Sequence, residues 1–231
     1  MALEPPVRAE TLEALRCLDT CSISNAIEAF QVRLRNAGFA DSRIRCMFED
    51  FPPMVGYAAT ARLRSGEPPI AGSYHDRVDW WNSILRVPAP RIVVMEDLDE
   101  RPGVGAFLGD MHAAILRALG CVGYVTNGAV RELPRVRETG LHLFAGNVAV
   151  SHAYAHIFDF GSKVKVGGLE VHPGNLLHGD RHGLLTVPKE IAAEVPAVAI
   201  RLQQAEQKVI DLCGSQEFSI DKLRQVLKSL S

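Results

Sequence analysis

The sequence predicts an α/β fold with mixed sheets and a helical C-terminal extension, and three observations lead to this prediction. Residues 91–96 form a short, continuous apolar run that ends in acids, which is typical of a strand buried on both faces. Residues 103–132 follow the order glycine-rich turn, helix, turn, strand and charged pair, as expected of a parallel unit. After residue 141, short apolar runs separated by turns favour antiparallel hairpins.

Two short helices are expected near the N-terminus. Leucines recur at nearly helical spacing over residues 12–18, and the polar pair that follows breaks the pattern. Ser22 or Ser24 is then positioned to cap a second helix over residues 25–30, because a serine oxygen can accept an otherwise unpaired N–H.

The next segments alternate between loop and strand signals. Residues 35–53 are mixed polar and predict a loop with one short strand. Residues 54–63 alternate small and apolar side chains before a Ser-Gly turn, which predicts a strand. Residues 67–81 contain prolines, glycine and a pair of tryptophans, and we expect an insertion or a helix start packed over the mouth of a pocket.

In the central unit, residues 103–132, we expect a helix over residues 111–119 and a strand over 123–126. Further strands are expected after this unit. They are predicted over residues 141–150, 163–166, 169–171, 176–177 and 184–187. Residues 191–212 are rich in Ala, Glu, Gln and Lys with apolar residues at helical intervals, and Gly214 is placed to end this helix. A last short helix over 218–230, with Ser219 as its cap, completes the chain. We therefore predict two parts, an α/β domain over residues 1–188 and a helical extension over 189–231.

Composition limits the classes of function. The chain has 231 residues, of which 47% are hydrophobic and 23% charged, and a formal net charge of -2. These ordinary globular values favour neither nucleic acid nor membrane as a partner. The first 15 residues have no apolar signal core and no run of 18 apolar residues occurs, so we expect a cytoplasmic protein that is neither secreted nor membrane-spanning.

The cysteines and histidines give weak metal signals. Five cysteines without a CxxC pattern indicate reduced thiols, and Cys17 and Cys21, four apart, make a poor zinc site without a nearby histidine pair. Six of the eight histidines fall between residues 142 and 182, but there is no HExxH pattern. We favour hydrogen-bonding or surface roles for these histidines. His152 can still reach the pocket expected beside the central stretch, residues 103–144. The glycine run at 103–109 is not the dinucleotide fingerprint, so an NAD cofactor is not expected.

The central stretch holds the candidate site. The turn ending at Gly109 and Asp110 opens a helix, where unpaired N–H groups and the helix dipole favour an anion. Twenty residues separate Asp110 from Arg131, and a helix followed by a returning strand can bring them to one edge together with Glu132. Two plainer interpretations stay open: a turn without a ligand, and a surface ion pair between Arg131 and Glu132 that contributes little.

The same stretch resembles the signature of the regulator-of-ribonuclease-activity-A-like family. That family includes class II, metal-dependent aldolases acting on 4-hydroxy-4-methyl-2-oxoglutarate. Its pattern is matched by Gly109, Asp110, Gly120, Gly123, Val125, Gly128, Arg131 and Glu132. The opening LDTCSISNAIEAF, the strand MVGYAATARL and the closing VGGLEVHPGNLLHGDRHGLLTVP are similar to further family motifs, although Asn25 stands where aspartate is usual.

The resemblance implies a fold and an assembly. The fold is a swivelling β/β/α-type sandwich with mixed sheets, covering about residues 11–188. The subunits of that family assemble as homotrimers, sometimes paired into hexamers, with sites at the subunit boundary.

The resemblance also implies a reaction: cleavage of small 2-oxo acids, by retro-aldol cleavage of 4-hydroxy-2-oxo acids or by oxaloacetate decarboxylation through a pyruvate enolate. Mg²⁺ or Mn²⁺ would be the cofactor, with Glu132 as a ligand and Asp110 acting through a metal-bound water. Arg131 would neutralise and orient the substrate oxygens, and the amides of Gly109, Asp110 and Met111 would hold its carboxylate.

Two features bear on that function. The characterised aldolases carry aspartate where this chain has Glu132, which is one methylene longer.

The alternative function is a non-catalytic protein-binding regulator, since the family's namesake inhibits a ribonuclease by masking it. The presence of both Asp110 and Glu132 favours metal chemistry.

Overall fold

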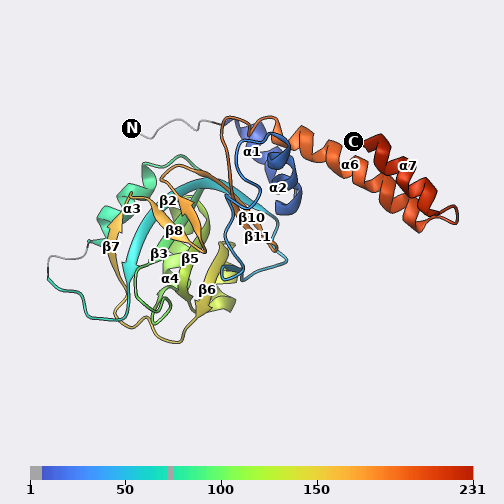
Figure 1. The fold of residues 1–231 in the computed structure, drawn as a ribbon. Helices are drawn as coiled ribbons and strands as arrows, with labels where there is room; N and C mark the ends of the chain where they lie inside the picture. Colours follow the sequence, from blue (N-terminus) through green and yellow to red (C-terminus); the bar gives the residue numbers. More distant parts are fainter. Residues whose placement is uncertain (1–6, 72–74, 231) are drawn as a thin grey trace.

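The structure is a computed structural model that describes residues 7–71 and 75–230. It consists of a body built on one large mixed sheet and a helical hairpin, α6 (Val195–Gly214) and α7 (Ile220–Leu230), that projects from the body (Figure 1). Among the described residues, no helix combines the length and apolar character that crossing a bilayer requires. The predicted α/β class with mixed sheets and C-terminal helices is confirmed.

The main sheet has nine strands, of which seven follow the order β1-β6-β5-β3-β2-β10-β11. Parallel pairs join β2 to β3, β3 to β5 and β5 to β6, whereas β10 and β11 are antiparallel. β4 pairs with β5, β7 with β2, and β8 and β9 form a separate hairpin. The strands are β1 (Arg45–Cys46), β2 (Met54–Arg64), β3 (Arg91–Asp97), β4 (Ala106–Leu108), β5 (Cys121–Val130), β6 (His142–Val148), β7 (His156–Phe160), β8 (Val164–Val166), β9 (Leu169–Val171), β10 (Leu176–Asp180) and β11 (Gly183–Val187).

Both faces of the sheet are covered, as the apolar run of β3 predicts. Val93 and Met95 point into one hydrophobic core and Ile92 and Val94 into another, because successive side chains of a strand alternate between faces. The first core includes α3 and α4, and the second lies under the β8–β9 hairpin. A third core joins α1, α2 and the start of α6 to the end of the sheet.

The N-terminal helices are α1 (Ala9–Arg16) and α2 (Thr20–Ala29). The predicted serine cap of the second helix is wrong: α2 begins earlier, and Asp19 caps it by accepting the Ser22 N–H at 2.9 Å. The Ser22 hydroxyl donates to the other oxygen of Asp19 at 2.7 Å. The carboxylate takes the capping position because Ser22 already lies inside the first turn.

The central helices surround the candidate site. They are α3 (Arg77–Leu85), α4 (Asp110–Ala118) and α5 (Leu133–Glu138). α3 begins inside the segment where a helix start was expected, and residues 72–74 of that segment lie outside the described residues. The sequence did not predict β4, which lies within the glycine-rich turn, or α5, which follows directly after Glu132.

The C-terminal helices are α6 (Val195–Gly214) and α7 (Ile220–Leu230). α6 ends at Gly214, and the Ser219 hydroxyl accepts the Lys222 N–H at 3.2 Å, as a cap for α7 does. Val195 and Ala199 are buried in the core with α1 and α2, so the first turns of α6 belong to the body. The domain boundary at residue 188 stays a prediction.

Candidate functional site

The candidate site lies where two parallel strands end at the same edge. β4 pairs with β5, and Leu108 lies opposite Val130. The Arg131 N–H donates to the Leu108 carbonyl at 3.0 Å, which continues this pairing by one residue. Because both strands end here, residues 109–110 and 131–132 leave the sheet side by side. This is the convergence that the spacing of the central stretch predicts.

Glu132 connects the two segments. Its Oε2 accepts the Asp110 N–H at 3.0 Å, and its Oε1 accepts from Nη2 of Arg131 at 2.9 Å. The backbone of Glu132 is in the left-handed region, at φ 57°, and α5 starts directly after it. A non-glycine residue in this region is uncommon, and such strained positions cluster at functional sites.

Gly109 is required by the approach of that carboxylate. A Cβ built on Gly109 would clash with Oε2 of Glu132. With glycine at this position, the acid reaches the N-terminus of α4, where the unpaired N–H groups and the helix dipole favour negative charge.

Asp110 lies on the first turn of α4 with its own partners. Its Oδ1 accepts the Met111 N–H at 2.6 Å, and its Oδ2 lies 3.3 Å from Nη1 of Arg135. The Met111 N–H, followed by Arg135, holds the pKa of Asp110 below its usual range. Two of the three amides predicted to hold a substrate carboxylate, those of Asp110 and Met111, are therefore engaged by the chain's own acids.

These residues line one cavity of about 360 Å³. The side chains of Arg131, Glu132 and Asp110 are each about a third exposed, so they are accessible to a small ligand. The structure thus brings together all five residues that the sequence singled out: Gly109, Asp110, Met111, Arg131 and Glu132. His152 lines the same cavity, as its position after Ser151 allowed. The catalytic and binding roles of these residues stay predictions.

Sequence reasoning missed five lining residues, of which two are the alanines Ala106 and Ala155 and three have larger side chains. Arg77 of α3 and Phe107 of β4 line the cavity, and His112 of α4 lies against the Phe107 ring with centroids 4.8 Å apart. Burial, and then the charge of Arg77, lowers the pKa of His112 to about 4, so its imidazole is neutral near pH 7. Its Nε2 has no hydrogen-bond partner among the described residues. One feature of the sequence could have identified His112 as a lining residue: it follows Asp110 by two positions and so lies in the first turn of α4.

The donors present fit a hard divalent cation. Asp110 and Glu132 offer carboxylate oxygens, the ligand type that Mg²⁺ and Mn²⁺ prefer. Each carboxylate keeps lone pairs beyond the hydrogen bonds described, because two oxygens have about four acceptor positions. The neighbouring Arg131 and Arg135 balance the negative charge.

Comparison with known proteins locates the chain in a family. The pattern of the RraA-like family, described as Aldolase/RraA, matches residues 20–186. A protein of Halalkalibacterium halodurans, provisionally named as a 4-hydroxy-4-methyl-2-oxoglutarate aldolase, is 27% identical over 107 residues. That match covers 46% of this chain and 48% of the relative. Protein DlpA of Legionella pneumophila is 25% identical over 141 residues, which cover 58% of this chain and 22% of the relative. The chain therefore spans half or less of these two curated relatives.

Solved structures share the fold. An uncharacterized protein from Pseudomonas syringae pv. tomato has a TM-score of 0.73 at 23% identity, over 97% of this chain and 98% of that one. RraAS2 of Streptomyces coelicolor, described as an unusual member of the RNase ES inhibitor RraA protein family, has a TM-score of 0.68 at 21% identity, over 87% and 96%. With the family pattern matched over residues 20–186, most of the chain, this protein belongs to the RraA-like family.

Proposed function

We propose that the chain is a divalent-metal-dependent lyase of small 2-oxo acids. The reaction is retro-aldol cleavage of a 4-hydroxy-2-oxo acid, decarboxylation of oxaloacetate, or both, each passing through a pyruvate enolate. The observation that carries the proposal is the convergence of Arg131, Glu132 and Asp110 on one cavity at the N-terminus of α4. The provisional aldolase name of the Halalkalibacterium relative points to the same chemistry.

We assign each residue a role from the family resemblance, and its position in the cavity supports that role. The guanidinium of Arg131 is held by Glu132 at 2.9 Å and keeps further N–H donors for the carboxylate and 2-oxo oxygens of a substrate. Glu132 and Asp110 would hold the cation, and the family resemblance implies Glu132 as a ligand and Asp110 acting through a water molecule. A divalent cation, when bound, supplies the positive charge that stabilises the developing enolate.

The engaged amides add a condition for binding. A substrate carboxylate reaches the amides of Asp110 and Met111 only when Glu132 and Asp110 release them. Glu132 and Asp110 would hold a bound cation with the same carboxylates that accept these N–H groups, so the cation and the amides would compete for them.

The test is pyruvate release from 4-hydroxy-2-oxo acids and from oxaloacetate, with Mg²⁺ or Mn²⁺ and with excess chelator. The rate with metal alone is subtracted, because free cations also promote decarboxylation. Arg131→Ala is expected to lower kcat/KM by at least about a hundredfold, the scale of losing a charged transition-state contact. The control is Arg201→Ala, an exposed arginine on α6.

Pyruvate release by the parent in excess chelator, or full activity in Arg131→Ala, would contradict this function. Circular dichroism of both variants shows whether a loss of activity comes from unfolding.

The second candidate is a non-catalytic, protein-binding regulator. One observation favours it: the acids and amides of the site already satisfy one another without a ligand. A pull-down with a ribonuclease, together with no turnover in the assay above, would support this candidate. For either function we propose a homotrimer or hexamer, from the resemblance of the central motif.

A further inference from the structure

A second group of metal-binding side chains lies where α2 begins, beside the turn between β10 and β11. Among the residues that the structure describes, Asp19, Cys21 and His182 each present a ligand atom, and these atoms lie within 4.8 Å of one another. None of the three lines the cavity at α4. This group, the Asp19–Cys21–His182 cluster, is therefore separate from the proposed site of cleavage.

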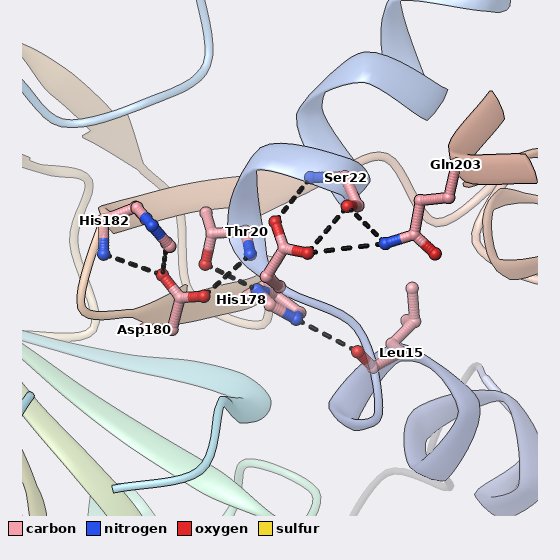
Figure 2. Close-up of polar contacts among 8 residues, drawn as sticks. Leu15, Thr20, Ser22, His178, Asp180, His182 and Gln203 are labelled. Atoms are coloured by element: carbon pink, nitrogen blue, oxygen red, sulfur yellow. Dashed lines mark hydrogen bonds and ion pairs between the residues drawn. The ribbon is translucent and has the colours of Figure 1, made fainter. Parts of the chain in front are cut away.

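Buried polar contacts hold the cluster in place (Figure 2). Asp180, which is 4% exposed, accepts the Thr20 N–H at 2.9 Å and the His182 N–H at 2.8 Å. The fully buried His178 contacts the Thr20 hydroxyl at 3.0 Å and the Leu15 carbonyl at 3.0 Å. These contacts fasten the start of α2 to the β10–β11 turn, so Cys21 and His182 are brought together by the fold itself. Pre-positioned ligands lower the conformational cost of binding an ion.

Asp180 also determines which nitrogen of His182 is free. Its Oδ1 lies 3.1 Å from Nδ1 of His182, so the neutral imidazole donates its proton there and keeps the lone pair on Nε2. A carboxylate that holds the second nitrogen of a histidine is the usual companion of a metal-ligating imidazole.

The donor types select the ion. A thiolate, an imidazole and a carboxylate together suit Zn²⁺ and Co²⁺, whereas Mg²⁺ prefers oxygen ligands alone. We propose that Asp19, Cys21 and His182 bind one Zn²⁺-class ion through three protein ligands, with a fourth position left for water or another small ligand. Three ligands and an open position are the pattern of reactive zinc sites rather than of closed structural ones.

Binding requires one proton to leave. Burial, and then the charges of Asp19 and Asp180, raises the pKa of the Cys21 thiol, so the free protein holds the S–H form near pH 7. On coordination the sulfur gives its proton to solvent and its electron pair to the metal, with no change in oxidation state. The same negative charges that disfavour a bare thiolate attract a cation. Asp19 keeps lone pairs for the ion beside its two contacts to Ser22 and a 3.5 Å contact from Nε2 of Gln203.

The experiment is a titration of the full-length, metal-free protein with Co²⁺, followed by absorbance. A thiolate bound to Co²⁺ gives a sulfur-to-metal charge-transfer band in the near ultraviolet, which reports the sulfur ligand directly. We expect one such site per chain, and added Zn²⁺ should abolish the band. Cys21→Ser should remove it, whereas Cys213→Ser, an exposed cysteine on α6, should leave it unchanged.

A second pair of variants tests the histidine. His182→Gln should weaken Co²⁺ binding at least about tenfold, the lower end of the range for losing even a supporting residue of a metal site. The control is His172→Gln, an exposed histidine on a neighbouring turn. Circular dichroism of each variant confirms that it is folded.

The outcomes separate this site from the proposed lyase site. Glu132→Gln should leave the charge-transfer band intact, since Glu132 lines the cavity at α4 and none of the three cluster residues does. The proposal is overturned if the parent shows no thiolate band with Co²⁺, or if the band persists in Cys21→Ser. Neither result bears on pyruvate release.

Discussion

At the scale of single residues, Glu132 stands out because it combines a strained backbone with two engaged oxygens. Holding an L-residue in the left-handed region costs roughly 1–2 kcal/mol. The contacts with the Asp110 N–H and with Arg131 offset this cost. The strained backbone is therefore tolerated because its side chain is held, and strained positions of this kind cluster at functional sites.

Glu132→Gly tests this balance. Glycine relieves the strain but removes both contacts, so the free energy of unfolding should change by less than about 1 kcal/mol. Turnover should be lost, because the variant lacks the carboxylate that we propose as the ligand of the cation, although Asp110 still lines the cavity. The matched control is Gln31→Gly, an exposed residue at φ 54°, which should become more stable by about 1 kcal/mol. Urea denaturation measures both. A loss of more than about 3 kcal/mol in Glu132→Gly would show that its contacts dominate the strain.

At the scale of elements, the strong predictions came from local signals. β2, β3, α4 and β5 were predicted because their alternation, apolar runs and glycine stops lie within each segment. β4 was missed because its three residues form a strand only through pairing with β5. α5 was missed because six residues carry little periodicity. Arg135, which contacts Asp110, was missed with it.

The difference between local and long-range signals also explains why the sequence predicted the site at α4 but not the Asp19–Cys21–His182 cluster. Gly109, Asp110, Arg131 and Glu132 belong to one supersecondary unit, so their spacing predicted that they meet. The Asp19–Cys21–His182 cluster joins residues that lie far apart in the sequence, and nothing local to Cys21 indicates a histidine beside it. The sequence-based dismissal of zinc rested on the pair Cys17 and Cys21, and the fold supplies a different partner.

Truncation tests how the C-terminal helices contribute to stability. Ending the chain after residue 214 removes α7 and should leave the free energy of unfolding within about 1 kcal/mol of the parent, because the buried residues of α6 lie in its first turns. Ending it after residue 194 removes Val195 and Ala199 from the core and should cost more than about 3 kcal/mol. Thermal and urea denaturation compare the two. Equal losses in both truncations would mean that α7 supports the body.

At the scale of the whole molecule, buried histidines make stability depend on pH. Burial lowers the pKa of His112 and of His142 to about 4, and lowers the pKa of His178. At His112 and His142 the unfolded chain binds a proton near pH 6.5, whereas the folded chain does not until about pH 4. Protonation therefore favours the unfolded state, and stability that is fully present above pH 6.5 is lost as the pH falls toward 4.

His142→Phe isolates one of these groups. Phenylalanine can keep the stacking on Phe144, whose ring centroid lies 4.9 Å away, but cannot take up a proton. Between pH 7 and pH 5 the parent should lose about 2 kcal/mol more stability than the variant, from one titration at about 1.4 kcal/mol per pH unit. Urea denaturation at several pH values gives the slopes. Identical slopes would show that His142 does not contribute.

The pairing of β2 has a consequence for synthesis on the ribosome. This eleven-residue strand bonds to β3 on one side, but its other edge is covered by β7 and β10, which lie about a hundred residues further along the chain. Until those strands emerge, one edge of a growing hydrophobic sheet is bare and open to pairing with another nascent chain. Production of this protein should therefore be sensitive to crowding of ribosomes on its message and to the supply of chaperones that shield exposed strands.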